Sequence, residues 1–367
     1  MLSWIEINTK NIKNNIKELK KQLHLKTKFM AVVKGNAYGH GLLEVSQNIK
    51  NDVDYLSVYD FNDALILRKN KIKTPILVLG RSFKQEALDA VKHNIEITIT
   101  TFDVLKEIAG LKKRPQIHFC FDTGIGRDGF NLSDLSEVVK ITTKNKIAVK
   151  GLYMHFSAAD DKNSDDYSKK QVDNFLKIKK AFADINIKPL CYISASGGVM
   201  MKNFGYDFDM VRSGISLYGM WPSDDVYERF KNKIKLKPAL SFKTKIVEIK
   251  SMPKGSFIAY NRTCQLQRDS KIAILPVGYF DGILRNASNK AQVLIKGKRC
   301  NQLGRVMMNM LIIDVTEIKN IKAGNIATII GNDGKETITA EEWANWAQTI
   351  NYEITTKLSA FLPRIVK

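Results

Sequence analysis

The sequence predicts an α/β protein in which an N-terminal TIM-type (β/α)8 barrel is followed by a C-terminal, mainly β-strand domain. In the first 215 residues, eight short apolar runs alternate with helical segments, which is the pattern of parallel βαβ units. Eight is also the number of strands that closes a TIM barrel. After about Asp224 the chain changes to short strands separated by turn residues. An open, doubly wound sheet is the competing architecture for the first part.

The predicted barrel strands are rich in β-branched residues, as buried parallel strands are. They are Phe29–Val33, Tyr55–Val58, Ile76–Leu79, Ile95–Ile99, Ile117–Phe121, Val149–Phe156, Leu190–Ser194 and Asp209–Arg212. Helices are expected between them at Phe61–Asn70, Gln85–His93, Asp103–Lys113 and Tyr167–Ile185. In the last helix, Phe175, Ile178 and Phe182 recur at helical spacing along one face.

The second domain is predicted from strands and turns after the barrel, with domain boundaries at 1–232 and 233–367. Its expected strands are Ala239–Ile249, Lys271–Val277, Gln292–Ile295, Leu311–Val315 and Asn325–Ile330. The GNDG sequence at Gly331–Gly334 is a turn signal, and a helix is expected around Ala340–Thr349.

The charge and cysteine content exclude several classes of protein. The chain carries 58 Lys and Arg against 37 Asp and Glu, a net charge of +21, but no recognisable nucleic-acid motif gathers these charges, so no nucleic-acid partner is expected. No apolar run approaches the roughly 18 residues of a membrane span, and the N-terminus lacks an apolar signal core, which favours the cytoplasm. The four cysteines offer no CxxC pair, so no metal site is expected.

In a TIM barrel, chemistry is expected where strands end and the following loops begin. Lys34 follows the first apolar strand, in AVVKGNAYGHG. Desolvation there lowers the pKa of a lysine, which a Schiff-base lysine requires. A surface lysine that caps the strand is the alternative interpretation, and the glycine-rich turn with Tyr38 favours the first.

Further candidates follow later strands. Arg127, in the glycine-rich FDTGIGRDGF, is suited to binding a carboxylate, and His155 ends the sixth strand, although a hydrogen-bonded core histidine is the alternative there. The seventh and eighth strands run into the loops 194–198 and 212–215, whose backbone N–H groups are suited to binding phosphate. Together, these features describe a site for pyridoxal 5'-phosphate (PLP).

Several segments resemble the alanine racemase family, in the family's order: AVVKGNAYGHG, FDTGIGRDGF, MHFSAAD, VRSGISLYG, VGYFDGILR, LGRVMMNM and NYEI. The resemblance covers nearly the whole chain. It implies a fold-type-III PLP enzyme with an N-terminal barrel, a C-terminal β domain, and a head-to-tail homodimer with shared active sites.

The resemblance also implies roles for individual residues. Lys34 resembles the lysine that binds PLP and acts as the base on the D-face. Tyr279, in VGYFDG, resembles the opposite base, supplied by the partner subunit and supported by His155 and, behind it, Arg212. Arg212 also matches the arginine at the pyridine nitrogen. The residues similar to the phosphate-binding set are Tyr38, Ser196, Gly214, Ile215 and Tyr352, and those similar to the carboxylate-binding set are Arg127 and the partner subunit's Met308.

Some positions depart from the family. Cys120 stands where many members have a lysine that becomes carbamylated and braces the carboxylate-binding arginine. A cysteine cannot become carbamylated, which leaves three possibilities. Another anion such as chloride holds Arg127, a different hydrogen-bond network holds it, or Arg127 is more mobile. Ala195 replaces an asparagine that is usual before the phosphate-binding serine, and Met307, Asn309 and Met310 replace residues common beside the methionine.

The resemblance therefore implies interconversion of L- and D-alanine by a lysine and a tyrosine, which supplies D-alanine for peptidoglycan. The changed positions motivate an alternative, a racemase of serine, lysine or arginine. A fold-type-III amino-acid decarboxylase is a further alternative, and the pairing of Lys34 with Tyr279 argues against it.

Overall fold

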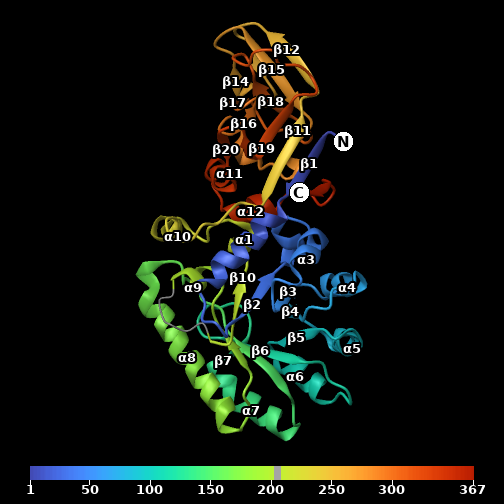
Figure 1. The fold of residues 1–367 in the computed structure, drawn as a ribbon, viewed down its shortest axis with the longest axis vertical. Coiled ribbons are helices and arrows are strands. Elements are labelled where there is room, and N and C mark those ends of the chain that lie inside the picture. The colour runs from blue at the N-terminus through green and yellow to red at the C-terminus, as the bar shows by residue number, and fades with distance from the viewer. Residues whose placement is uncertain (202–207) are drawn as a thin grey trace. The chain divides into compact units, whose positions relative to one another are not determined.

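The computed structural model describes residues 1–201 and 208–367, which form two compact units (Figure 1). The barrel unit consists of Asn11–Ala37 and Val45–Lys237. The β unit consists of Met1–Lys10, Tyr38–Glu44 and Pro238–Lys367. The chain passes from the barrel unit to the β unit between Lys237 and Pro238. The domain boundary expected between residues 232 and 233 stays a prediction.

The described residues of the barrel unit contain eight parallel strands in the order β10-β2-β3-β4-β5-β6-β8-β9. The first and last are joined by hydrogen bonds from Asp209 N to Cys191 O and from Arg212 N to Ser194 O, both 2.9 Å, so the barrel is nearly closed. This confirms the TIM-type barrel over the open sheet. The strands are β2 Lys28–Val32, β3 Tyr55–Val58, β4 Ile76–Arg81, β5 Glu96–Ile99, β6 Ile117–Asp122, β8 Val149–Tyr153, β9 Leu190–Tyr192 and β10 Met210–Ser213, and β7 Phe130–Asn131 pairs with β6.

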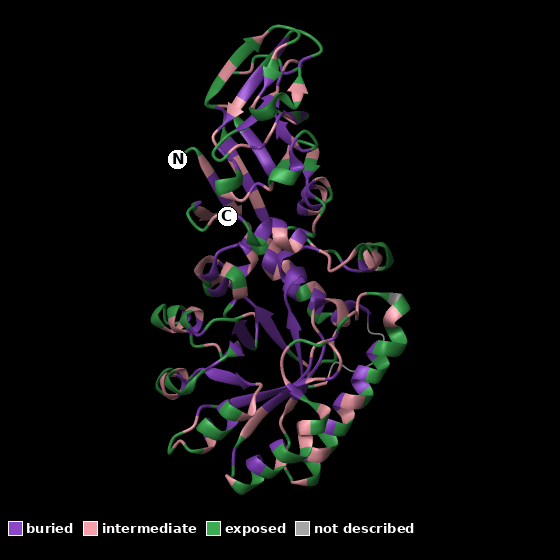
Figure 2. Ribbon diagram, turned by 180° about the vertical axis from the view of Figure 1, so that it is seen from behind, coloured by how far each residue is buried: buried purple, intermediate pink, exposed green. Residues whose placement is uncertain are grey.

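Amphipathic helices surround the barrel, with buried strands at the centre and exposed faces outside (Figure 2). α8 turns Val172, Phe175, Ile178 and Phe182 inward, as its spacing predicts. The helices are α1 Thr9–Lys20, α3 Leu42–Ile49, α4 Phe61–Lys69, α5 Lys84–His93, α6 Phe102–Ala109, α7 Leu135–Lys144, α8 Asp165–Asp184, α9 Ser196–Met201 and α10 Asp224–Phe230. The segment labelled α2, Lys34–Tyr38, is a short turn with left-handed backbone. The helix predicted at Asp103–Lys113 is too long, because α6 ends at Ala109 and Gly110 caps it.

The β unit is built on an extended sheet in the order β12-β15-β18-β17-β16-β19-β11-β1-β21, with β20 paired to β19. The strands are β1 Ser3–Ile7, β11 Leu240–Lys245, β12 Glu248–Met252, β15 Ser270–Leu275, β16 Gln292–Ile295, β17 Lys298–Leu303, β18 Leu311–Asp314, β19 Ile326–Asp333, β20 Glu336–Ile338 and β21 Arg364–Val366. β13 Phe257–Ile258 pairs with β14 Cys264–Gln265, and the helices are α11 Ala340–Ala347 and α12 Asn351–Thr356. The strand-rich second domain is confirmed.

The single strand predicted at Ala239–Ile249 is wrong. The chain there forms β11 and β12, which pair with different neighbours: β11 with β1 and β19, and β12 with β15. The change occurs at Ile246, whose N–H donates to Asn325 O, and Val247, whose N–H donates to Ile274 O. An apolar run cannot reveal that its two halves bond to separate strands. Within the described residues, no helix is long and apolar enough to cross a membrane.

Candidate active site

Lys34 lies two residues after the end of β2 and begins a strained turn. Gly35, Asn36, Ala37 and Tyr38 have φ of 61°, 53°, 54° and 53°, so four consecutive residues are left-handed. The left-handed conformation costs roughly 1–2 kcal/mol for each residue with a side chain. Such strain persists where the surrounding structure fixes it, and it concentrates at functional sites. The strained turn therefore marks Lys34 as a functional candidate.

The electrostatic surroundings of Lys34 are cationic. Burial lowers its pKa, the charges of Arg127 and Arg212 lower it further, and Asp128 opposes them. The direction agrees with the prediction for a lysine that follows an apolar strand. Within the described residues, no carboxylate forms an ion pair with Lys34. A half-buried amine whose charged form is disfavoured in this way is suited to act as a nucleophile.

Arg212 lies within β10, where only 5% of its surface is exposed. Its Nη2 donates to Met154 O at 2.5 Å and lies 3.4 Å from His155 Nδ1. Its guanidinium carbon lies 4.6 Å from the ring centre of Tyr153 and 5.4 Å from that of Tyr192. The buried Nε makes no hydrogen bond within the described chain, which leaves one donor available to a bound group.

His155 lies two residues after β8. Burial and the charges of Arg212, Arg127 and Lys34 lower the pKa of His155 well below its usual value. The imidazole is therefore neutral near pH 7, and a neutral ring can accept a hydrogen bond.

The loop that carries Arg127 is closed by Asp122 at the end of β6. The carboxylate of Asp122 accepts hydrogen bonds from the N–H groups of Gly124 at 2.8 Å, Gly126 at 3.2 Å and Arg127 at 2.9 Å. These bonds outweigh the effect of burial and lower the pKa of Asp122. The loop is thus fixed by a carboxylate that stays ionised.

Asp128 holds the Arg127 side chain, with Nε donating to Oδ1 at 2.8 Å. Burial opposes the charged form of Arg127, but the hydrogen bond and charge of Asp128 raise its pKa. Burial raises the pKa of the Cys120 thiol to about 12, so this thiol supplies no negative charge. Asp128 thus supplies Arg127 with a charged hydrogen-bond partner, which Cys120 does not.

The loops after β9 and β10 meet at one hydroxyl group. Ser196 Oγ accepts hydrogen bonds from the N–H groups of Gly214 at 3.0 Å and Ser216 at 3.4 Å. Ile215, between them, is buried at the start of the 3-10 helix Ile215–Tyr218. The structure thus brings together a hydroxyl group and backbone N–H groups, the donors that phosphate sites use.

Two of the predicted phosphate-binding residues, Tyr38 and Tyr352, meet in the β unit. Their ring centres lie 6.2 Å apart with 53° between the ring planes. The neighbouring Gly39 has φ +83°, Arg364 Nε donates to its carbonyl oxygen at 3.0 Å, and a Cβ there would overlap Thr355 O. Glycine at this position therefore allows the turn after Tyr38 to pack against α12.

We expect Gly39→Ala to lower the free energy of unfolding of the β unit by about 2 kcal/mol or more, because it adds a backbone collision to an unfavourable φ. Gly324→Ala is the matched control, since Gly324 has φ +86° and an added Cβ would have no neighbour within 4 Å. The control should cost only about 1 kcal/mol. Urea denaturation of both variants measures the difference, and equal losses would contradict the close approach to Thr355.

Tyr279 and Met308 lie on neighbouring loops of the β unit. Tyr279 N donates to Met307 O, and Phe280 N donates to Met308 O, both at 3.0 Å. A Cβ on Gly278 would overlap the carbonyl oxygens of Met307 and Met308, so glycine lets the loops join. Tyr279 is 44% exposed and Met308 54% exposed. The β unit thus presents the predicted base and the predicted carboxylate-binding residue together.

The family models match both parts of the chain. The model described as alanine racemase, N-terminal domain, matches residues 7–222, and that described as alanine racemase, C-terminal domain, matches residues 239–366. The chain belongs to the alanine racemase family. It is therefore an enzyme, an isomerase of the amino-acid racemase class.

Alanine racemases from several organisms match this chain over nearly its whole length. Alanine racemase 2 of Caldanaerobacter subterraneus subsp. tengcongensis is 40% identical over 98% of this chain and 94% of its own. The alanine racemase of Methanococcus maripaludis is 39% identical over 99% of this chain and 98% of its own. The solved alanine racemase of Clostridium difficile 630 has a TM-score of 0.92 and 32% identity, covering 100% of this chain and 96% of its own. The predicted barrel with its strand-rich second domain and the predicted family are both confirmed.

Three further polar residues, which the sequence did not single out as candidates, take part in hydrogen bonds in the barrel unit. Asp128 is adjacent to Arg127 in the sequence, and a carboxylate beside a predicted anion-binding arginine was a usable signal. Glu96 and His118 are polar residues in apolar strands and contact each other inside the barrel. Their pairing depends on strand register, which the sequence alone does not reveal.

Proposed function

We propose that the protein interconverts L- and D-alanine with PLP, using Lys34 and Tyr279 as two bases on opposite faces of the substrate. The observation that carries this is the half-buried Lys34 at the start of the strained turn after β2, where burial and the charges of Arg127 and Arg212 lower its pKa. Alanine as the substrate is supported by relatives named alanine racemase over the full chain.

The residues of the barrel unit fit PLP. Lys34, Arg127 and Arg212 surround the site with positive charge, only partly offset by Asp128, so an anionic ligand is favoured. The buried Nε of Arg212 is a donor without a hydrogen bond inside the described chain, which suits the pyridine nitrogen. Ser196, Gly214 and Ile215 suit the phosphate, as do Tyr38 and Tyr352 in the β unit.

When bound, PLP supplies an electron-withdrawing ring that makes the substrate's Cα–H acidic. Lys34 Nζ would hold the cofactor until the substrate amine takes its place, and the released amine would then transfer the proton on the D-face. Tyr279 Oη transfers the proton on the L-face. The neutral His155 accepts from Arg212 at Nδ1, 3.4 Å away, so its Nε2–H is the donor that would support the oxygen of the tyrosine when it acts as a base.

Arg127 and the partner subunit's Met308 receive the substrate carboxylate in this proposal. A guanidinium suits a carboxylate because its donors match the two oxygens. Since Asp128 occupies Nε, the Nη groups remain for the substrate. Arg127 therefore orients the amino acid while Asp128 orients Arg127.

A homodimer with shared sites is part of the proposal, with Tyr279 supplied to the partner's site. Supporting it, the rings of Phe280 and Phe361 stack at 6.2 Å with 4° between planes, and they are 56% and 85% exposed. Exposed aromatic pairs of this kind are typical of protein interfaces. The proposal places the enzyme in the cytoplasm, where it supplies D-alanine for peptidoglycan.

The pH dependence of PLP binding should report on Lys34. Unprotonated amine is the reactive form, so the rate at which the apoprotein combines with PLP should rise with pH through the pKa of Lys34. Arg127→Met removes a charge that lowers this pKa and should shift the midpoint to higher pH, whereas Asp128→Asn removes a charge that raises it and should shift the midpoint to lower pH. Stopped-flow absorbance measures both, and shifts in the same direction would contradict the assignment.

Substrate comparison tests the proposed function. Turnover of L-alanine should exceed that of L-serine, L-lysine and L-arginine, each followed by chiral chromatography of the products. A better substrate than alanine would favour the alternative that Met307, Asn309 and Met310 suggest. Release of labelled carbon dioxide from a carboxyl-labelled amino acid would instead indicate a decarboxylase.

A further inference from the structure

Three polar side chains that the proposed chemistry does not use form a line inside the barrel. We define the buried relay as Glu96, His118 and Tyr192. Glu96 Oε2 lies 2.6 Å from His118 Nε2, and the Tyr192 hydroxyl lies 2.8 Å from His118 Nδ1. His118 and Tyr192 are 0% exposed and Glu96 is 8% exposed. The three residues come from β5, β6 and β9, so strand pairing in the barrel sets their alignment.

A neutral imidazole has one donor and one acceptor nitrogen, so the two hydrogen bonds of His118 run in one direction. Burial raises the pKa of Tyr192 well above its usual value, so the hydroxyl keeps its proton and can donate a hydrogen bond to Nδ1 of a neutral His118. The other nitrogen, Nε2, is then the N–H that donates to the Glu96 carboxylate. The relay is a carboxylate, an imidazole and a hydroxyl in series, each bonded to the next.

The barrel is shaped to hold the central imidazole. Gly151 on β8 is in register with His118 on β6, and a Cβ at Gly151 would overlap the imidazole ring. Gly151 thus leaves room for the ring at the position where both of its nitrogens are bonded. Burying a carboxylate is costly, and well-packed apolar residues often serve stability equally well. Stability alone therefore does not explain why these three polar residues lie inside the barrel.

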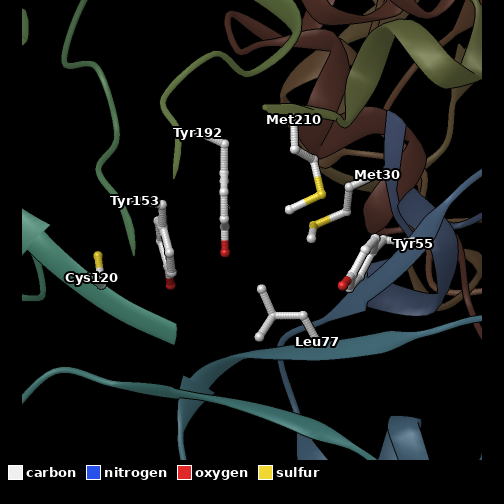
Figure 3. Close-up of a cluster of buried hydrophobic side chains, with 7 residues drawn as sticks. All are labelled: Met30, Tyr55, Leu77, Cys120, Tyr153, Tyr192 and Met210. Carbon is white, nitrogen blue, oxygen red and sulfur yellow. The ribbon is translucent and has the colours of Figure 1, made fainter. Parts of the chain in front are cut away.

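The relay leads to Arg212. The rings of Tyr192 and Tyr153 are stacked, with centres 5.1 Å apart and 14° between planes, and Figure 3 shows them side by side in the core cluster. The Arg212 guanidinium carbon lies 5.4 Å from the Tyr192 ring centre and 4.6 Å from that of Tyr153. Such contacts attract a cation to the ring face. The hydroxyl end of Tyr192 is fixed by His118, so the ring beneath Arg212 has a defined place.

We propose that Glu96, His118 and Tyr192 are positioning residues that hold Arg212 in the geometry required at the pyridine nitrogen of PLP. This inference rests on the proposed function. Loss of the relay frees the Tyr192 ring, and the guanidinium then loses part of its support. The expected consequences are weaker PLP binding and more frequent conversion of PLP to pyridoxamine phosphate during turnover, because the arginine disfavours protonation of the ring nitrogen.

Two variants interrupt the relay in different ways. Tyr192→Phe removes the hydroxyl and keeps the ring, and Gly151→Ala displaces the imidazole while keeping all three relay side chains. The matched control is Thr142→Val, which removes a fully buried hydroxyl group on α7 of the barrel unit, outside the relay. PLP dissociation constants are measured by titrating each apoprotein, and thermal unfolding of the apoproteins is recorded alongside.

Tyr192→Phe and Gly151→Ala should each raise the PLP dissociation constant about fivefold, the effect of one lost hydrogen bond. They should also increase pyridoxamine phosphate formed per turnover, whereas Thr142→Val should match the wild type in both. Equal PLP affinity in all four proteins, or equal losses in all three variants, would overturn the inference, because the relay would then serve only the core. Failure of the wild type to bind PLP would overturn the proposed function as well.

Discussion

Lys34→Ala is expected to abolish the long-wavelength absorbance of bound PLP and to lower racemisation by roughly 10⁴-fold or more in both directions. The side chain would be lost both as the group that holds the cofactor and as the D-face base, and a positioned base alone contributes roughly 10²–10⁴-fold. Absorbance spectra after reconstitution, and chiral analysis from either isomer, measure the two effects.

Lys28→Ala provides the control for this variant. Lys28 is the exposed first residue of β2, so its substitution removes a lysine from the same strand outside the site. The control should retain the absorbance and the rate of the wild type. An unchanged spectrum in Lys34→Ala would contradict the assignment of Lys34.

Tyr279→Phe is expected to keep the PLP absorbance and to lower racemisation by roughly 10²–10⁴-fold, since it removes one proton-transferring group and leaves the cofactor site intact. Tyr260→Phe is the control, because Tyr260 is another exposed tyrosine of the β unit, at 67% exposure. Its rate should equal that of the wild type. Wild-type racemisation in Tyr279→Phe would show that another group acts on the L-face.

Mixing the two inactive variants tests whether sites are shared between subunits. If Tyr279 serves the partner, a dimer of one Lys34→Ala and one Tyr279→Phe subunit contains one intact site. Random reassociation of equal amounts should then restore about a quarter of wild-type activity. No recovery in a mixture that sedimentation shows to have exchanged subunits would contradict the shared site.

The sequence was most informative where one segment carries its own signal. The barrel strands are apolar runs bounded by polar loops, and all eight predicted strands are present with shifts of only a few residues at their ends. Lys34 was detectable for the same reason, as a charge that directly follows such a run. Its lowered pKa depends mainly on burial, which an apolar strand foretells.

The sequence was least informative where distant segments meet. β1 pairs with β11 and with β21, whose residues lie at Leu240–Lys245 and Arg364–Val366, and nothing in Ser3–Ile7 indicates those partners. The same limit concealed the contact of Glu96 with His118, which needs the register of β5 and β6. The pairing of Asp128 with Arg127 is local but depends on a side-chain conformation that composition does not set.

The central claim is that Lys34 and Tyr279 act on opposite faces of the substrate, and solvent deuterium tests it most directly. Deuterium entering the Cα position of L- and D-alanine is followed by mass spectrometry for wild type, Lys34→Ala and Tyr279→Phe. The wild type should exchange from both isomers, and Tyr279→Phe should lose exchange from L-alanine while exchange from D-alanine continues. Full exchange from L-alanine in Tyr279→Phe would contradict the two-base account.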